Sequence, residues 1–125
     1  MANPNILTAT SVLGKRQNNG PVATSIANLL TNASSSNKVY RVLSIRATNI
    51  DNSNANTLSL AVGTGTVALG NATTFLHQKS IAASTNVQIL EDPIYLLEGE
   101  SIAAVVGTGV GGGSINIMFG YEEIS

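Results

Sequence analysis

The feature that most constrains the fold of this chain is the alternation of apolar and polar residues over short segments that end in turns. Leu58, Leu60 and Val62 alternate with Thr, Ser and Ala, and residues 115–121 show the pattern most clearly. Because successive side chains of a strand point to opposite faces, a period of two produces one apolar face. We therefore predict a single all-β domain over residues 1–125, an antiparallel β-sandwich that is jelly-roll-like.

The same criteria predict seven to nine short strands, with turn signals about every 8–12 residues. Helix signals are weak, because the best candidate, residues 25–31, is short and is followed by turn-forming Asn and Ser. The strong apolar face of residues 115–121 predicts a position in the middle of a sheet. The other predicted strands are residues 38–50, 58–62, 73–81, 87–89, 94–97 and 102–106.

Two arrangements remain open for residues 1–20, an extended N-terminal arm or a first strand followed by a loop. Residues 5–15 have strand character, and Gly14 and the polar segment 17–21 are expected to end it, since proline cannot continue a regular ladder. An arm made of residues 2–11 could pair with a sheet edge of another protein by strand addition.

The alternating positions also predict which side chains fill the core. They are the large or branched apolar residues that recur at every second position, together with one alanine. The predicted core consists of Leu43, Ile45, Leu58, Leu60, Val62, Ile102, Ala104, Ile115, Ile117 and Phe119.

Charge is scarce in this chain, which bears on how it stays in solution. Charged residues make up 10% of the sequence, against about 25% in an ordinary soluble domain, and the formal net charge is -1. Such a surface is tolerable if much of it is buried in an assembly, and we favour this interpretation over a neutral surface rich in Thr and Asn. The absence of cysteine excludes disulfides, thiol nucleophiles and thiolate metal sites.

The charges are also divided along the sequence. All six cations precede residue 80, where only Asp51 opposes them, and all six charged residues after residue 80 are acidic. Opposite charges so divided can pair across neighbouring strands of one domain or between neighbouring subunits. Both interpretations stay open from the sequence.

Motifs for catalysis or cofactor binding are missing or lack their context. His77 is the single histidine, no G-x-S-x-G occurs, and the G-x-G-x-x-G match at residues 107–112 precedes a strand pattern instead of a helix. The pairs Glu91–Asp92 and Glu122–Glu123 are adjacent, so on a strand the two carboxylates of a pair point to opposite faces. We predict no enzymatic activity, no cofactor and no metal site.

Nucleic-acid binding, a membrane-spanning segment and secretion with N-glycosylation are not expected. A nucleic-acid reader needs a basic surface with stacking aromatics, whereas this chain is slightly acidic and 4% aromatic. No apolar run approaches the roughly 18 residues that span a bilayer. The first residues lack the pattern of a secretory signal, so the glycosylation sequons at Asn32 and Asn71 are expected to be incidental.

Four stretches together resemble a known class of proteins. They are residues 1–6 (Met-Ala-Asn-Pro-Asn-Ile), 36–42 (Ser-Asn-Lys-Val-Tyr-Arg-Val), 92–102 (Asp-Pro-Ile-Tyr-Leu-Leu-Glu-Gly-Glu-Ser-Ile) and 120–125 (Gly-Tyr-Glu-Glu-Ile-Ser). The chain resembles the short structural proteins of tailed bacteriophages, notably cyanobacterial and other marine phages. Residues 94–102 also resemble the strand–turn–strand of many virion jelly rolls. The resemblance implies a virion component of the head, neck, tail or fibre, and it carries no catalytic residues.

From this resemblance and the composition we expect a capsid decoration protein, made in the host bacterial cytoplasm and located on the capsid surface. Its expected partners are the major capsid protein, or another virion protein, and copies of itself. Resemblance to virion jelly rolls implies a homotrimer, while composition alone equally allows a dimer. The candidate interface residues are Arg41, Arg46, Glu98 and Glu100. The alternatives are a tail, neck or fibre component, or a carbohydrate-binding module for host attachment.

Overall fold

The computed structural model describes residues 9–67, 72–90, 92–107 and 114–125, and this part of the chain folds into nine β-strands and no helix. Residues 2–8 of the possible arm, Asn71, Glu91 and most of the glycine-rich segment 107–112 lie outside it. The strands are β1 (Val12–Asn19), β2 (Ala27–Thr31), β3 (Val39–Asn49), β4 (Asn56–Thr64), β5 (Thr73–Ile81), β6 (Asn86–Gln88), β7 (Ile94–Leu96), β8 (Glu100–Val106) and β9 (Ile115–Ile124).

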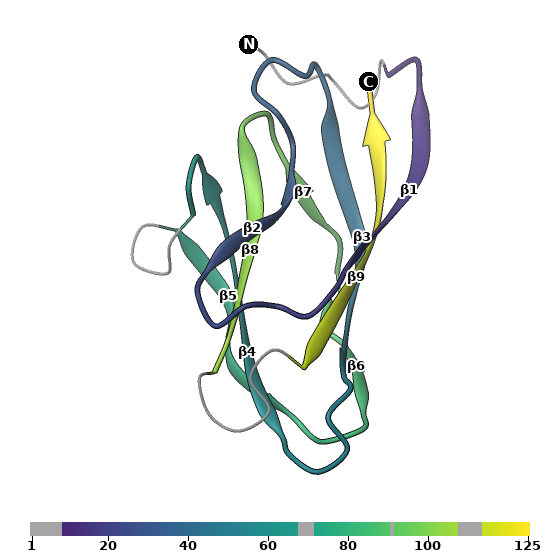
Figure 1. Cartoon of the computed structure of the whole chain (residues 1–125). Coiled ribbons are helices and arrows are strands. Elements are labelled where there is room, and N and C mark those ends of the chain that lie inside the picture. The colour runs from purple at the N-terminus through teal and green to yellow at the C-terminus, as the bar shows by residue number, and fades with distance from the viewer. Residues whose placement is uncertain (1–8, 68–71, 91, 108–113) are drawn as a thin grey trace.

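The strands form two antiparallel sheets that pack face to face (Figure 1). Sheet A has the order β1-β9-β3-β6, with β7 also paired to β3, and sheet B has the order β2-β8-β4-β5. Since β6 and β7 pair with different parts of β3, they act as one interrupted strand. The resulting connectivity is that of a jelly roll, which confirms the predicted fold class.

The central strands of sheet A are β3 and β9, the two segments with the strongest strand patterns. β9 pairs with β1 on one side and with β3 on the other, so the predicted position in mid-sheet is confirmed. Ile115, Ile117 and Phe119 alternate along β9 and point into the sandwich, where each is at most 1% exposed. The period of two therefore matches one buried and one outward face.

Most of the predicted core is buried, and one residue is placed wrongly. Val62 is only partly buried, and Leu43 is 45% exposed. Ile45, Leu58, Leu60, Ile102, Ala104, Ile115, Ile117 and Phe119 form one buried cluster with residues of both sheets.

Leu43 is exposed because β3 contains a bulge. The register of β3 against β9 shifts between Val42 and Ser44, which leaves Leu43 as the extra residue. A bulge interrupts the alternation, so Val42 and Ile45 both point inward although they are three positions apart. Strict alternation back from Ile45 therefore predicts Leu43 as the next core residue, whereas the bulge places Val42 in the core instead.

Replacing Leu43 by alanine tests this bulge. We expect Leu43→Ala to change the free energy of unfolding by less than about 0.5 kcal/mol, as is usual for an exposed position. Ile45→Ala, two positions on, should cost roughly 2–5 kcal/mol because Ile45 is fully buried. Urea titration of both variants measures the difference, and equal losses would mean that Leu43 belongs to the core.

Two strand assignments near the N-terminus differ from the sequence prediction. β1 continues through Gly14 and includes Gln17, Asn18 and Asn19, where the sequence predicts a loop. Residues 27–31, part of the weak helix candidate, form β2. In both places pairing with a neighbouring strand supplies the backbone hydrogen bonds, so tertiary context overrides the local preference for a turn or helix.

Two buried asparagines hold the connections at opposite ends of the sandwich. Asn32 Nδ2 donates to the carbonyl oxygens of Lys38 and Leu96, at 2.8 and 3.0 Å. Asn49 Nδ2 donates to those of Asn54 and Ile81, both at 3.0 Å. Both side chains are 0% exposed. The Asn32 amide is thus enclosed and engaged in hydrogen bonds, and this sequon offers no accessible acceptor.

Candidate functional site

The two outer faces of the sandwich differ in how they are covered. On sheet B, Ala61 and Ala103 point outward but are buried under Val67, which follows β4, with Ile26 and Ala72 packed at the side. Sheet A has the opposite character. All seven large apolar side chains that are exposed in the described part of the chain belong to strands of sheet A or directly follow one. They are Val12, Leu13, Leu43, Ile50, Tyr95, Leu97 and Met118.

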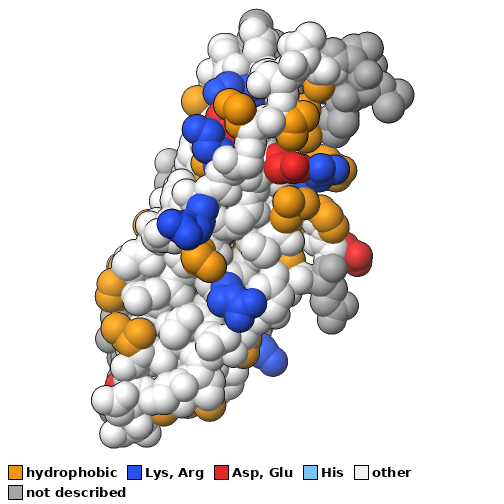
Figure 2. All heavy atoms as spheres, turned by 90° about the vertical axis from the view of Figure 1, so that its right-hand side faces the viewer, with side chains coloured by type: hydrophobic (Ala, Val, Ile, Leu, Met, Phe, Trp, Pro, Cys, Tyr) orange, Lys and Arg blue, Asp and Glu red, His pale blue; other side chains and the backbone are white. Residues whose placement is uncertain are grey.

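Sheet A also carries most of the positive charge. Lys15, Arg16, Arg41 and Arg46 lie on its strands and Lys38 directly precedes β3, whereas sheet B carries only Lys79. Figure 2 shows Lys and Arg side chains spread along the side of the molecule that carries β1, with hydrophobic side chains between them. We call the outward side of β1, β9, β3, β6 and β7 the sheet A face.

The acidic C-terminal segment meets part of this positive charge within the domain. Glu122 accepts hydrogen bonds from Arg41 on the outward side, including one from Nε at 2.7 Å. Glu123 points to the other side, where Lys38 Nζ lies 2.9 Å and Lys15 Nζ 3.9 Å from its carboxylate. Cross-strand pairing within one domain therefore accounts for these charges, and the prediction that adjacent glutamates face opposite ways is confirmed.

These contacts shift the proton affinities of the groups involved. The hydrogen bond to Glu123 raises the pKa of Lys38, and the hydrogen bond to Glu122 raises the pKa of Arg41. Tyr40 and Tyr121 pack together beside Glu123 with ring centroids 5.0 Å apart, and burial raises the pKa of both phenols. None of these shifts creates an acid or base that would titrate near neutral pH.

The four candidate interface residues lie in two places. Arg41 and Arg46 project outward from β3, and Arg46 Nη1 donates to Asn86 Oδ1 at 3.0 Å. Glu98 and Glu100 lie at the turn where the chain passes from β7 in sheet A to β8 in sheet B. Glu100 Oε1 accepts a hydrogen bond of 2.7 Å from the Leu97 backbone N–H. Arg41, Arg46 and Glu100 thus have hydrogen-bond partners within the domain, and contact of the four candidates with another subunit stays a prediction.

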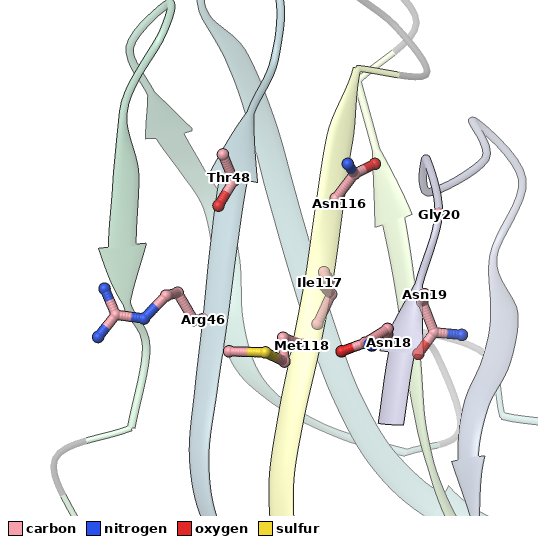
Figure 3. Close-up of a pocket in the computed structure, with 8 residues that line it drawn as sticks. All are labelled: Asn18, Asn19, Gly20, Arg46, Thr48, Asn116, Ile117 and Met118. Atoms are coloured by element: carbon pink, nitrogen blue, oxygen red, sulfur yellow. The ribbon is translucent and has the colours of Figure 1, made fainter. Parts of the chain in front are cut away.

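A pocket of about 380 Å³ opens on the sheet A face (Figure 3). Residues at the end of β1 and on β3 and β9 line it: Asn18, Asn19, Gly20, Arg46, Thr48, Asn116, Ile117 and Met118. Figure 3 shows Arg46 extending from β3 toward β6, so that its guanidinium points away from the Asn116 and Asn18 side of the pocket. The Asn116 Oδ1 atom is enclosed and has no hydrogen-bond partner among the described residues.

The chemistry of this lining is that of binding. Amides, a hydroxyl and a thioether can hydrogen-bond and contact a ligand, and these eight residues include no carboxylate, histidine or thiol to move a proton. Sequence reasoning missed the pocket because Asn18 and Asn19 were assigned to a loop. The alternation over residues 115–121 predicts that Asn116 and Met118 point outward, and this was the one sequence signal for part of the pocket.

His77 lies on β5, one of the two edge strands of sheet B, and is exposed. Within the described ranges no group of three or more His, Cys, Asp or Glu residues is close enough to hold a metal ion. In the same part of the chain there is also no helix of the length and apolarity that crossing a membrane requires.

Comparisons with known proteins were made for the sequence and for the structure. The chain matches no protein-family model, no curated protein and no solved structure. The jelly-roll topology and the sheet A face are therefore the observations from which a function is proposed.

Proposed function

We propose that this protein is a structural component of a tailed-phage virion, specifically a capsid decoration protein that docks on the major capsid protein through the sheet A face. The observation that carries the proposal is the distribution of exposed apolar side chains. All seven of those described lie on or next to sheet A strands, and all but Leu13, which shares the side of Glu123, belong to the outward side, with Arg16, Arg41 and Arg46 among them. The role is structural and needs no catalytic group.

The composition of the sheet A face supports docking onto a protein. Tyr, Met and Arg are enriched at protein–protein interfaces, and Tyr95, Met118, Arg41 and Arg46 all point outward from this sheet. Apolar side chains gathered on one face, where the opposite face is covered by the chain's own residues, mark an interaction surface. The low charge content agrees with a surface that is largely buried after assembly.

The resemblance to short phage structural proteins supports a phage virion as the particle to which this protein belongs. A decoration protein holds neighbouring capsid subunits together, and many equivalent weak contacts add up by multivalency. A tail, neck or fibre component would use the same face at few copies. Quantifying the protein in purified virions separates these locations, since decoration of the head requires many copies for each particle.

We further propose self-association into a homotrimer, for which Arg46 is the sharper test because Arg41 is already paired with Glu122. Arg46 forms no ion pair with any described residue. We expect Arg46→Glu to weaken self-association at least about tenfold, a change of about 1.4 kcal/mol. Lys79→Glu on sheet B, with the same change of charge, should leave it unchanged. Light scattering over a dilution series measures both. A stable 12.8 kDa monomer of the natural chain at micromolar concentration would contradict self-association.

A carbohydrate-binding role in host attachment is the second candidate, and the amide-lined pocket is the observation that favours it. Amide side chains and the enclosed Asn116 Oδ1 suit sugar hydroxyls. Aromatic platforms are scarce, however. Phe119 is buried and Tyr40 packs on Tyr121, so Tyr95, at 47% exposed, is the accessible ring on sheet A. A glycan array without binding at high protein concentration would remove this candidate.

A further inference from the structure

We infer that the outer edge of β1, with which no described strand pairs, is a docking site for an extended, acidic segment of a partner protein, which adds to sheet A as a further antiparallel strand. The inference concerns an edge of the sandwich, distinct from the sheet A face, and does not depend on the particle to which the chain belongs.

The two sheets have four edges, and three of them are interrupted. β5 shifts register at two places against β4 and has Gln78 in the left-handed region, at a φ of 47°. β2 has five residues and a register shift between Asn28 and Leu30. β6 and β7 have three residues each. Short or bulged edges of this kind resist further pairing.

β1 is the continuous edge. All eight of its residues pair with β9 in one unbroken register, from Val12 opposite Ile124 to Asn19 opposite Ile117. Val12 and Leu13 at its start are 54% and 50% exposed. A long, regular edge strand with exposed apolar residues is a template on which another strand can pair.

The hydrogen bonds next to β1 show which of its backbone groups face outward. Ser11 N–H donates to the Ser125 carbonyl at 3.0 Å, and Ser125 N–H donates back to the Ser11 carbonyl at 2.9 Å. An antiparallel ladder alternates between such pairs and pairs without hydrogen bonds. The backbone groups of the odd-numbered residues of β1 therefore bond to β9. The even-numbered residues direct their N–H and C=O groups away from β9, in the plane of the sheet and toward its open edge. These are Val12, Gly14, Arg16 and Asn18.

The charged residues of β1 indicate which kind of strand would pair with its outer edge. Lys15 and Arg16 are neighbours, so their side chains point to opposite faces of the sheet. Symmetric antiparallel pairing of two copies centred on either residue would place Lys15 opposite Lys15 or Arg16 opposite Arg16, and like charges directly opposite are destabilising. These two registers thus disfavour a second copy, and the neighbouring cations favour a strand with adjacent carboxylates. β9 meets the other side of β1 with such a pair, Glu122 and Glu123.

Two synthetic octapeptides with blocked ends test the inference on the full chain. The first is Thr-Val-Thr-Glu-Glu-Thr-Val-Thr, and the second has Lys-Lys in place of Glu-Glu. We expect the glutamate peptide, at about 1 mM, to slow hydrogen exchange of the amides of Val12, Gly14, Arg16 and Asn18, and to bind at least about tenfold more tightly than the lysine peptide. Exchange measured by NMR identifies the residues. Unchanged exchange at these amides, or equal binding of both peptides, would overturn the inference.

Variants of Gly14 separate strand addition from charge attraction alone. Gly14→Pro removes one outward N–H and keeps both cations, and proline is tolerated on an edge strand. Gly14→Ala keeps the N–H, and its Cβ would meet no atom within 4 Å. We expect the proline variant to bind the glutamate peptide at least about tenfold more weakly, and the alanine variant to bind it like the natural chain. Equal binding by both variants would refute strand addition.

Thermal unfolding of both variants shows whether each folds, and if the proline variant does not, the two-peptide comparison on the natural chain still decides. If light scattering shows a dimer that Gly14→Pro abolishes and Gly14→Ala preserves, the edge pairs with a second copy, and the acidic partner is wrong.

Discussion

Phe119→Ala is expected to lower the free energy of unfolding by roughly 3–5 kcal/mol, which is among the largest effects available in this chain. Phe119 is the largest fully buried side chain, and it lies on β9 between Gln17 of β1 and Ile45 of β3. Truncation removes its apolar contacts with both sheets and leaves a cavity. Because domains of this size are stable by about 5–15 kcal/mol, the variant should be close to unfolding.

The adjacent residue provides the control. Met118 lies on the same strand but points outward and is 38% exposed, so Met118→Ala should cost less than about 1 kcal/mol. Ile117→Ala, on the inward side, should cost roughly 2–5 kcal/mol. Urea unfolding followed by circular dichroism compares the three. A loss below half a kilocalorie for Ile117 or Phe119 would show that the inward face of β9 is assigned wrongly.

Asn49→Leu is expected to destabilise the fold by at least about 3 kcal/mol, although leucine has the same number of side-chain heavy atoms and greater hydrophobicity. Asn49 makes four side-chain hydrogen bonds while fully buried. Its Nδ2 donates to two carbonyl groups, and its Oδ1 accepts from the Asp51 N–H and the Ser114 hydroxyl, at 3.0 and 2.9 Å. Leucine removes all four hydrogen bonds, and each buried group that is left unpaired costs roughly 1–3 kcal/mol.

Asn52→Leu is the matched control, because Asn52 lies in the same connection but is exposed and accepts one bond of 3.2 Å from the Ser84 hydroxyl. We expect it to change stability by less than about 1 kcal/mol. Chemical unfolding of the two variants measures the difference. If Asn49→Leu were neutral or stabilising, apolar burial would outweigh the lost hydrogen bonds, and the asparagine would not be needed to hold this end of the sandwich.

The proposals together assign different roles to the two sheets. Sheet B is closed by the chain's own residues, since Val67 covers its outward alanines and bulges interrupt both of its edge strands. Sheet A presents apolar and basic side chains on its face and a continuous strand at its β1 edge. A partner that contacts both would therefore approach sheet A. The Arg46 variant reports on self-association, and the Gly14 variants report on pairing at the β1 edge.

The sequence was least informative where polar residues repeat. In the sequence, Asn32 and Asn49 look like the many asparagines of the turns, because asparagine is a common turn residue. Only the fold brings Asn32 to the Leu96 carbonyl, 64 residues away, and Asn49 to the Ile81 carbonyl, 32 residues away. The pocket is hidden for the same reason, because Asn18, Thr48 and Asn116 become neighbours only when β1, β3 and β9 pair.

The sequence by itself determined the fold class, the central position of residues 115–121 and most of the core. Alternation along a strand is a local property, and apolar side chains that share one face must be buried whatever the topology. The tertiary structure alone decided the exposure of Leu43, the extent of β1, the pairing of Arg41 with Glu122, and the contrast between a covered sheet B and an open sheet A. These features depend on which strands become neighbours and in what register, and that is set by the packing of the whole chain.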